Sequence, residues 1–168
     1  MDPARLGMTT RVYTRNRVRL ALEGHTVSPS FYDQACAIEE CLASLAYLGN
    51  GTKYHEAILK GLTLNWHGVN ELYMWKLDGT LELLELSGIT IGERHPSYGD
   101  DHVALKFLET FMAKATNLIT LKISNFDIVR WVDDEEETLN LAMEEIVAQG
   151  RGQVEKTFST LVSRIENW

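Results

Sequence analysis

Residues 81–91 read LELLELSGITI, with apolar residues at positions 1, 4, 6, 9 and 11 of the stretch. The same spacing recurs, in whole or in part, at residues 17–27, 59–69 and 118–128. In an extended strand, Leu84 and Leu86 point to one face and Glu85 to the other. The chain is therefore predicted to contain four such strands. We expect eight residues of these strands to be buried: Leu20, Leu22, Leu62, Leu64, Leu84, Leu86, Leu121 and Ile123.

Segments with helical periodicity lie between these strands. Residues 101–116 place apolar side chains three and four positions apart, and residues 30–48 do the same after Pro29. An order of strand, helix, strand, helix favours parallel strands with helices on one face. The predicted fold class is therefore α/β, closed by C-terminal helices.

The spacing is similar to L-x-x-L-x-L-x-x-N-x-L, the pattern of one leucine-rich repeat. The four copies begin 42, 22 and 37 residues apart, which predicts a short and irregular array. The asparagine of the pattern is replaced in this chain by His25, His67, Ile89 and Phe126.

Residues 107–123, FLETFMAKATNLITLKI, resemble the divergent leucine-rich-repeat region of F-box-type proteins, particularly fungal ones. The resemblance covers about residues 17–128. It implies repeats that bind a protein substrate, while a separate F-box docks on a cullin ubiquitin ligase. We find no recognisable F-box before Arg17, so the resemblance implies only substrate recognition.

Three regions are expected along the chain. Residues 1–16 form an Arg-rich N-terminal segment, residues 17–130 the repeat-like core, and residues 131–168 the C-terminal capping helices. Within the last region, five acidic residues at 133–137 favour a helix N-terminus, because the helix dipole stabilises negative charge there. After the break at Gly150-Arg151-Gly152, apolar residues at helical spacing predict a closing helix.

The charge is unevenly distributed. The chain carries a net charge of −8, but residues 1–19 hold five arginines and one aspartate, a net of +4, which leaves −12 for the rest. An acidic body argues against general nucleic-acid binding. The arginines fit a charged edge strand, an arm for an acidic partner or a targeting peptide. We find neither a secretory signal nor an apolar run of membrane-spanning length, and therefore expect a cytoplasmic or nuclear protein.

The first functional hypothesis is a non-catalytic module that binds another protein through the open face of the strands. It requires no cofactor or metal, and it leaves open self-association through a sheet edge. The predicted binding residues are those between and beside the leucines: Arg19, Glu23, Thr63, Asn65, Glu85, Ser87, Lys122 and Ser124.

The alternative hypothesis is a compact α+β enzyme or small-ligand domain that uses Trp66, His67, His95 and His102. Residues 93–102 hold two histidines and three carboxylates, which are ligands that a divalent metal accepts. Against this, Pro96 and Gly99 are typical of a loop, and Asp100 or Asp101 suits the N-cap of the next helix. The nucleotide-binding, nucleophile and zinc-protease motifs G-x-G-x-x-G, G-x-x-x-x-G-K-[ST], G-x-S-x-G and H-E-x-x-H are absent.

Overall fold

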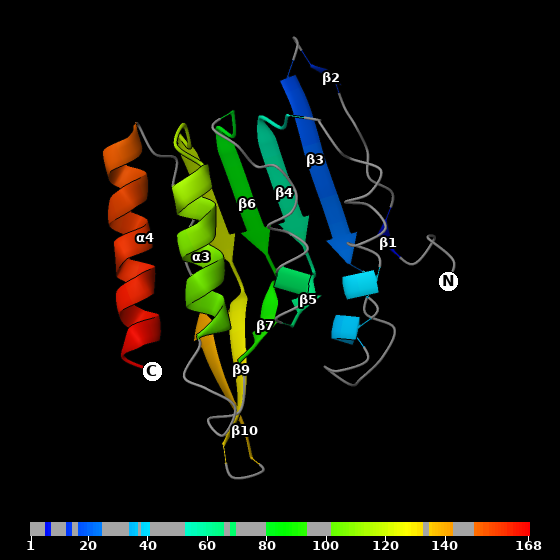
Figure 1. Ribbon diagram of the computed structural model, residues 1–168, viewed down its shortest axis with the longest axis vertical. Coiled ribbons are helices and arrows are strands. Elements are labelled where there is room, and N and C mark those ends of the chain that lie inside the picture. Colours follow the sequence, from blue (N-terminus) through cyan, green and yellow to red (C-terminus); the bar gives the residue numbers. More distant parts are fainter. Residues whose placement is uncertain are drawn as a thin grey trace.

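A computed structural model shows an α/β fold in which parallel strands lie beside helices (Figure 1). The structure describes residues 6–7, 13–14, 17–24, 34–36, 38–40, 53–65, 68–69, 80–93, 102–132, 135–142 and 150–168. The strands in these residues are β1 (Leu6–Gly7), β2 (Tyr13–Thr14), β3 (Arg17–Gly24), β4 (Glu56–Lys60), β5 (Thr63–Leu64), β6 (Leu83–Ser87), β7 (Thr90–Gly92), β8 (Thr120–Ser124), β9 (Phe126–Val132) and β10 (Glu135–Leu141). The two long helices are α3 (Val103–Lys114) and α4 (Arg151–Glu166).

The first sheet contains four parallel strands in chain order, β3, β4, β6 and β8. The short strands β1 and β2 pair antiparallel with β3. Two lines of residues cross all four parallel strands in register and are at most 3% exposed. They are Leu20, Ala57, Leu84 and Leu121, and then Leu22, Leu59, Leu86 and Ile123.

The second sheet is formed by shorter strands that follow the long ones along the chain. Strands β5, β7 and β9 are parallel, and β10 pairs antiparallel with β9. Leu64 pairs with Ile91, which pairs in turn with Ile128, and all three are fully buried. The repeating unit is therefore a long strand, a tight turn and a second strand.

The tight turn uses a left-handed residue at the same place in three successive units. Gly61, Gly88 and Asn125 have φ angles of 61°, 61° and 50°. Glycine adopts this conformation without steric cost, and asparagine tolerates it better than most residues do. The turns also hydrogen-bond to one another: the N–H of Gly61 donates to the carbonyl of Ser87 (2.8 Å), and that of Gly88 to Ser124 (2.9 Å).

The helices α3 and α4 lie side by side next to the strands (Figure 1). The buried face of α3 includes Phe107 and Phe111, which belong to the same apolar cluster as the inward leucines of the first sheet. Phe158 and Leu161 of α4 join this cluster. Residues 34–36 and 38–40 are also helical. The expected helices within 30–48 and 101–116, and the closing helix after Gly152, are thus confirmed in the described residues.

The burial of all eight expected strand residues is confirmed, but the register of the second motif is wrong. The strand that this unit contributes to the first sheet is Glu56–Lys60. Leu62 and Leu64 lie beyond it: Leu62 directly precedes β5, and Leu64 belongs to β5. Thr63 pairs with Thr90, not with a residue of β6. The units that begin with β4, β6 and β8 each contain two apolar-x-apolar pairs five residues apart. In the β4 unit the small side chain of Ala57 makes the first pair hard to recognise.

The helix expected to begin at the acidic run is also wrong for the described part of that segment. Glu135–Leu141 form β10, which makes a hairpin with β9. Leu139 and Leu141 are less exposed than the glutamates before them. Their spacing of two residues is the period of a strand. The cross-strand ion pair of Glu137 with Arg130 (2.9 Å) supports the pairing.

Candidate interaction surface

The outward side chains of the first sheet form a broad polar face. We call this the open face, and it comprises Arg19, Ala21, Glu23, Glu56, Ile58, Lys60, Leu83, Glu85, Ser87, Thr120, Lys122 and Ser124. Each of these residues is at least partly exposed, whereas the residues that alternate with them are buried. The buried side chains pack in one cluster with those of α3 and α4, so both long helices lie on the opposite side of this sheet.

Ion pairs and hydrogen bonds connect neighbouring strands across the open face. The Arg19 Nε lies 2.5 Å from Glu56 Oε2, and the Lys60 Nζ lies 3.0 Å from Glu85 Oε1. The Ser124 hydroxyl donates to that of Ser87 at 3.0 Å. Because these partners belong to different strands, they hold the exposed side chains in defined positions.

Two large apolar side chains lie among these charges. Ile58 pairs with Glu85, and Glu56 pairs with Leu83, so Ile58 and Leu83 are diagonal neighbours on adjacent strands. Both are partly exposed. The open face therefore has a small apolar centre with an ion pair on either side of it, an arrangement typical of protein-binding surfaces.

Six of the eight predicted binding residues lie on the open face: Arg19, Glu23, Glu85, Ser87, Lys122 and Ser124. The other two, Thr63 and Asn65, do not, because the predicted register of their strand was five residues late. Thr63 is 5% exposed and donates to Gln34 Oε1 at 2.9 Å. Asn65 donates to Glu39 Oε2 at 3.2 Å and accepts from the Gly68 N–H at 2.8 Å. Both hold helical segments against the sheets.

The same register error concealed the central residues of the face. Ile58 and Lys60 occupy the positions that the sequence pattern assigns to Thr63 and Asn65, and Glu56 is the outward residue before them. The positions of the glycines in the sequence indicate the correct register of these residues. Gly61 follows the outward position of Lys60 as Gly88 follows that of Ser87, so aligning the two glycines gives the correct register.

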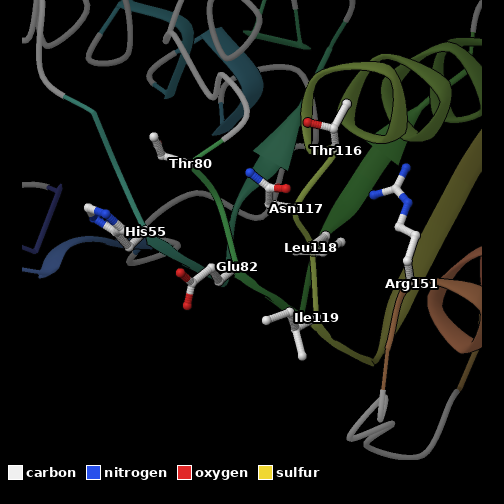
Figure 2. Close-up of a pocket in the computed structure, with 8 residues that line it drawn as sticks. All are labelled: His55, Thr80, Glu82, Thr116, Asn117, Leu118, Ile119 and Arg151. Carbon is white, nitrogen blue, oxygen red and sulfur yellow. The ribbon is translucent and has the colours of Figure 1, made fainter.

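A depression lies at the edge of the first sheet where the parallel strands begin, next to the ends of the two long helices (Figure 2). Its volume is about 540 Å³. His55, Glu82 and Ile119 precede β4, β6 and β8 at equivalent positions, and the amides of Glu82 and Ile119 donate to the carbonyls of His55 and Glu82, respectively, each at 2.8 Å. Ile119 is 47% exposed. Its side chain is an exposed apolar group in this depression.

The residues of the alternative hypothesis are only partly described by the structure. Trp66, His67 and His95 lie outside the described residues. His102 is the N-cap residue of α3, and its side chain makes no capping hydrogen bond. Asp100 and Asp101, the expected caps, lie outside the described residues. Within the described ranges, no three histidine, cysteine or carboxylate side chains lie together as metal ligands would.

Glu93, the residue that directly follows β7, caps the N-terminus of α3. Its two carboxylate oxygens accept hydrogen bonds from the amides of Val103 and Ala104, each at 2.7 Å. Burial raises the pKa of the Glu93 carboxyl above its usual value, while these hydrogen bonds act in the opposite direction. The bonds connect the strand side of the unit to its helix, which indicates a structural role for this acid.

No family model matches the chain, and no curated protein or solved structure is significantly similar to it. Among the described residues, none of the helices has the length and hydropathy of a membrane span.

Proposed function

We propose that this protein is a non-catalytic binding module whose open face recognises another protein. The observation that carries the proposal is the apolar centre of Ile58 and Leu83 with the Arg19–Glu56 and Lys60–Glu85 pairs beside it. Apolar side chains at the centre of an interface supply most of its binding energy, and polar side chains around them exclude water and select the partner.

The charge of the open face favours a protein partner over a nucleic acid. Three basic residues, Arg19, Lys60 and Lys122, balance three acidic ones on a chain with a net charge of −8. A phosphate backbone requires a net positive surface, whereas a face of alternating charge suits a folded or extended protein of complementary pattern.

We also propose a leucine-rich-repeat-like array as the scaffold, acting in substrate recognition. Support comes from the resemblance of residues 17–128 to the repeats of F-box-type proteins and from the recurring strand–turn–strand unit. The resemblance does not extend to an F-box, so we propose no recruitment of a ligase. We also propose no catalytic residue, metal or cofactor. We also propose a cytoplasmic or nuclear location. Self-association through an exposed sheet edge is the competing use of the strands.

The test is quantitative affinity capture from a lysate of the source cells, using the wild type and the double variant Glu85→Lys/Lys122→Glu. The variant keeps the net charge but reverses the pattern of the face. We expect at least one captured protein to fall by about tenfold or more, because misplaced like charges oppose docking.

The matched control is Glu135→Lys/Lys156→Glu, which also keeps the net charge and changes two exposed residues away from the open face. It should capture the same proteins as the wild type. Loss of the same partners in both variants, or in neither, would contradict the proposal. Sedimentation of the purified protein identifies self-association separately.

A further inference from the structure

A groove runs between α3 and α4 on the helical side of the molecule, away from the open face. We call it the α3–α4 groove, and its volume is about 470 Å³. The residues that line it are Glu109, Met112, Glu155, Phe158, Ser159, Val162, Ser163 and Glu166. Six of these belong to α4 at positions three and four apart, so they form one continuous stripe of about three helical turns.

The groove combines an apolar floor with an acidic rim. Phe158 is nearly buried, while Met112 and Val162 are partly exposed beside it. Exposed carboxylates lie at both ends of the α4 stripe, at Glu155 and Glu166. Among the residues that the structure describes, no basic side chain lines the groove.

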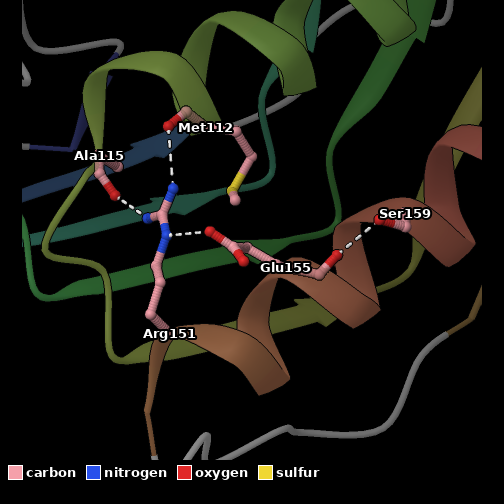
Figure 3. Close-up of polar contacts among 5 residues, drawn as sticks. All are labelled: Met112, Ala115, Arg151, Glu155 and Ser159. Atoms are coloured by element: carbon pink, nitrogen blue, oxygen red, sulfur yellow. Dashed lines mark hydrogen bonds and ion pairs between the residues drawn. The ribbon is translucent and has the colours of Figure 1, made fainter.

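The rim charges differ in how far they are compensated. Arg151 pairs with Glu155 (2.9 Å) and donates to the carbonyls of Ala115 and Met112, which occupies its guanidinium at the end of α3 (Figure 3). Within the described part of the chain, neither Glu109 nor Glu166 forms an ion pair. Two carboxylates beside an apolar floor are thus left for an external cation.

We propose that the α3–α4 groove binds a basic amphipathic helix of a partner protein. Its apolar face would pack on Met112, Phe158 and Val162, and its Lys or Arg side chains would pair with Glu109 and Glu166. Charge complementarity selects this occupant, and a helix lying in a groove between two helices is a common mode of peptide recognition. The protein would then join two partners, one on each side of the sheet.

The test uses fluorescence anisotropy with an 18-residue amphipathic peptide of leucine and lysine at helical spacing. A leucine–glutamate peptide with the same apolar face is the comparison probe. We expect saturable binding of the basic peptide and no saturable binding of the acidic one. Affinity for the basic peptide should fall about tenfold in Glu109→Lys/Glu166→Lys, because two attractions become repulsions.

Two matched controls separate the groove from the general negative charge. Glu135→Lys/Glu136→Lys makes the same change of charge on β10, at exposed residues. Ser159→Arg fills the groove, while Thr160→Arg places the same side chain at the next, exposed residue of α4, outside the groove lining. We expect Ser159→Arg to weaken binding about tenfold and both controls to stay within about twofold of wild type.

Equal losses in the groove variants and their controls would overturn the proposal, because non-specific attraction would then explain the binding. Absence of saturable binding to the basic peptide, or equal affinity for both peptides, would overturn it as well. So would a wild-type dimer that Ser159→Arg converts to a monomer, which would identify a second copy as the occupant. Circular dichroism melting of each variant verifies that the comparison is made between folded proteins.

Discussion

Gly61 lies at a point where the backbone leaves no room for a side chain. Its φ of 61° is in the left-handed region, and a Cβ atom added there would lie 2.8 Å from the carbonyl oxygen of Gly24. Gly88 has the same φ, but a Cβ atom on it would meet its nearest neighbour at 3.6 Å. The close approach of successive turns thus depends on glycine most strongly where β3 and β4 end.

We expect Gly61→Ala to lower the free energy of unfolding by about 2–4 kcal/mol, the sum of a left-handed conformation and a clash with rigid backbone. Gly88→Ala should cost about 1–2 kcal/mol, because only the conformational part applies. Gly152→Ala in α4 meets no atom within 4 Å and should leave the stability unchanged or raise it by up to about 1 kcal/mol. Urea denaturation measures all three, and a Gly61→Ala protein as stable as wild type would contradict the described turn.

The buried carboxyl of Glu93 gives the stability a dependence on pH. Because burial raises its folded pKa above the unfolded value, the folded state binds the proton more tightly. The stabilisation that the protonated Glu93 gives to the folded state is therefore fully present below the unfolded pKa of about 4.3. It is lost as pH rises through the pKa of Glu93 in the folded state. Relative to Glu93→Gln, the melting temperature of the wild type should fall as pH rises above the unfolded pKa of about 4.3. If the wild type instead gained melting temperature relative to Glu93→Gln as pH rises, the burial of this acid would be contradicted.

At the scale of elements, single side chains connect the ends of the helices to their surroundings. Glu93 accepts from the first amides of α3, and Arg151 donates to carbonyls at its end. A negative group at a helix N-terminus and a positive one at its C-terminus both oppose the charge of the helix dipole. Helix α3 is thus held at each end by a residue from another element.

We expect Arg151→Met to lower the free energy of unfolding by about 1–2 kcal/mol, since carbonyls at the end of α3 lose a charged donor and α4 loses its pair with Glu155. Methionine retains much of the side-chain bulk. Arg164→Met, at an exposed site on the same helix, is the control and should cost only a few tenths of a kcal/mol. Thermal unfolding followed by circular dichroism distinguishes the two, and equal effects would argue against the capping role.

At the scale of the whole molecule, the sequence predicts most of the elements but not their exact register. Leu84 and Leu86 have a clear partner pattern at Leu121 and Ile123, and these strands were predicted correctly. Ala57 is a weak signal for a core position, although its small side chain is fully buried. The first-sheet residues equivalent to Leu84 lie 37, 27 and 37 residues apart, a more even spacing than the predicted motifs had.

The candidate site could be predicted to the same extent as the strands that carry it. Alternation alone placed Glu85, Lys122 and the two serines on the open face. The ion pairs and the apolar centre depend on which residues of adjacent strands lie opposite each other, which periodicity within one strand does not determine. The β9–β10 hairpin was missed because Leu139, Ala142 and Met143 also match a helical spacing. Cross-strand pairing with β9 decided the conformation.

The most direct test of the binding role of the open face is site-specific photo-crosslinking in a lysate of the source cells. A benzophenone side chain is placed at Ile58, in the centre of the face, or at the exposed Thr160 on α4. We predict a discrete adduct from position 58 that disappears when Glu85→Lys/Lys122→Glu is added, and no such adduct from position 160. Adducts of equal yield from both positions, or none from position 58, would contradict the assignment of partner binding to this surface.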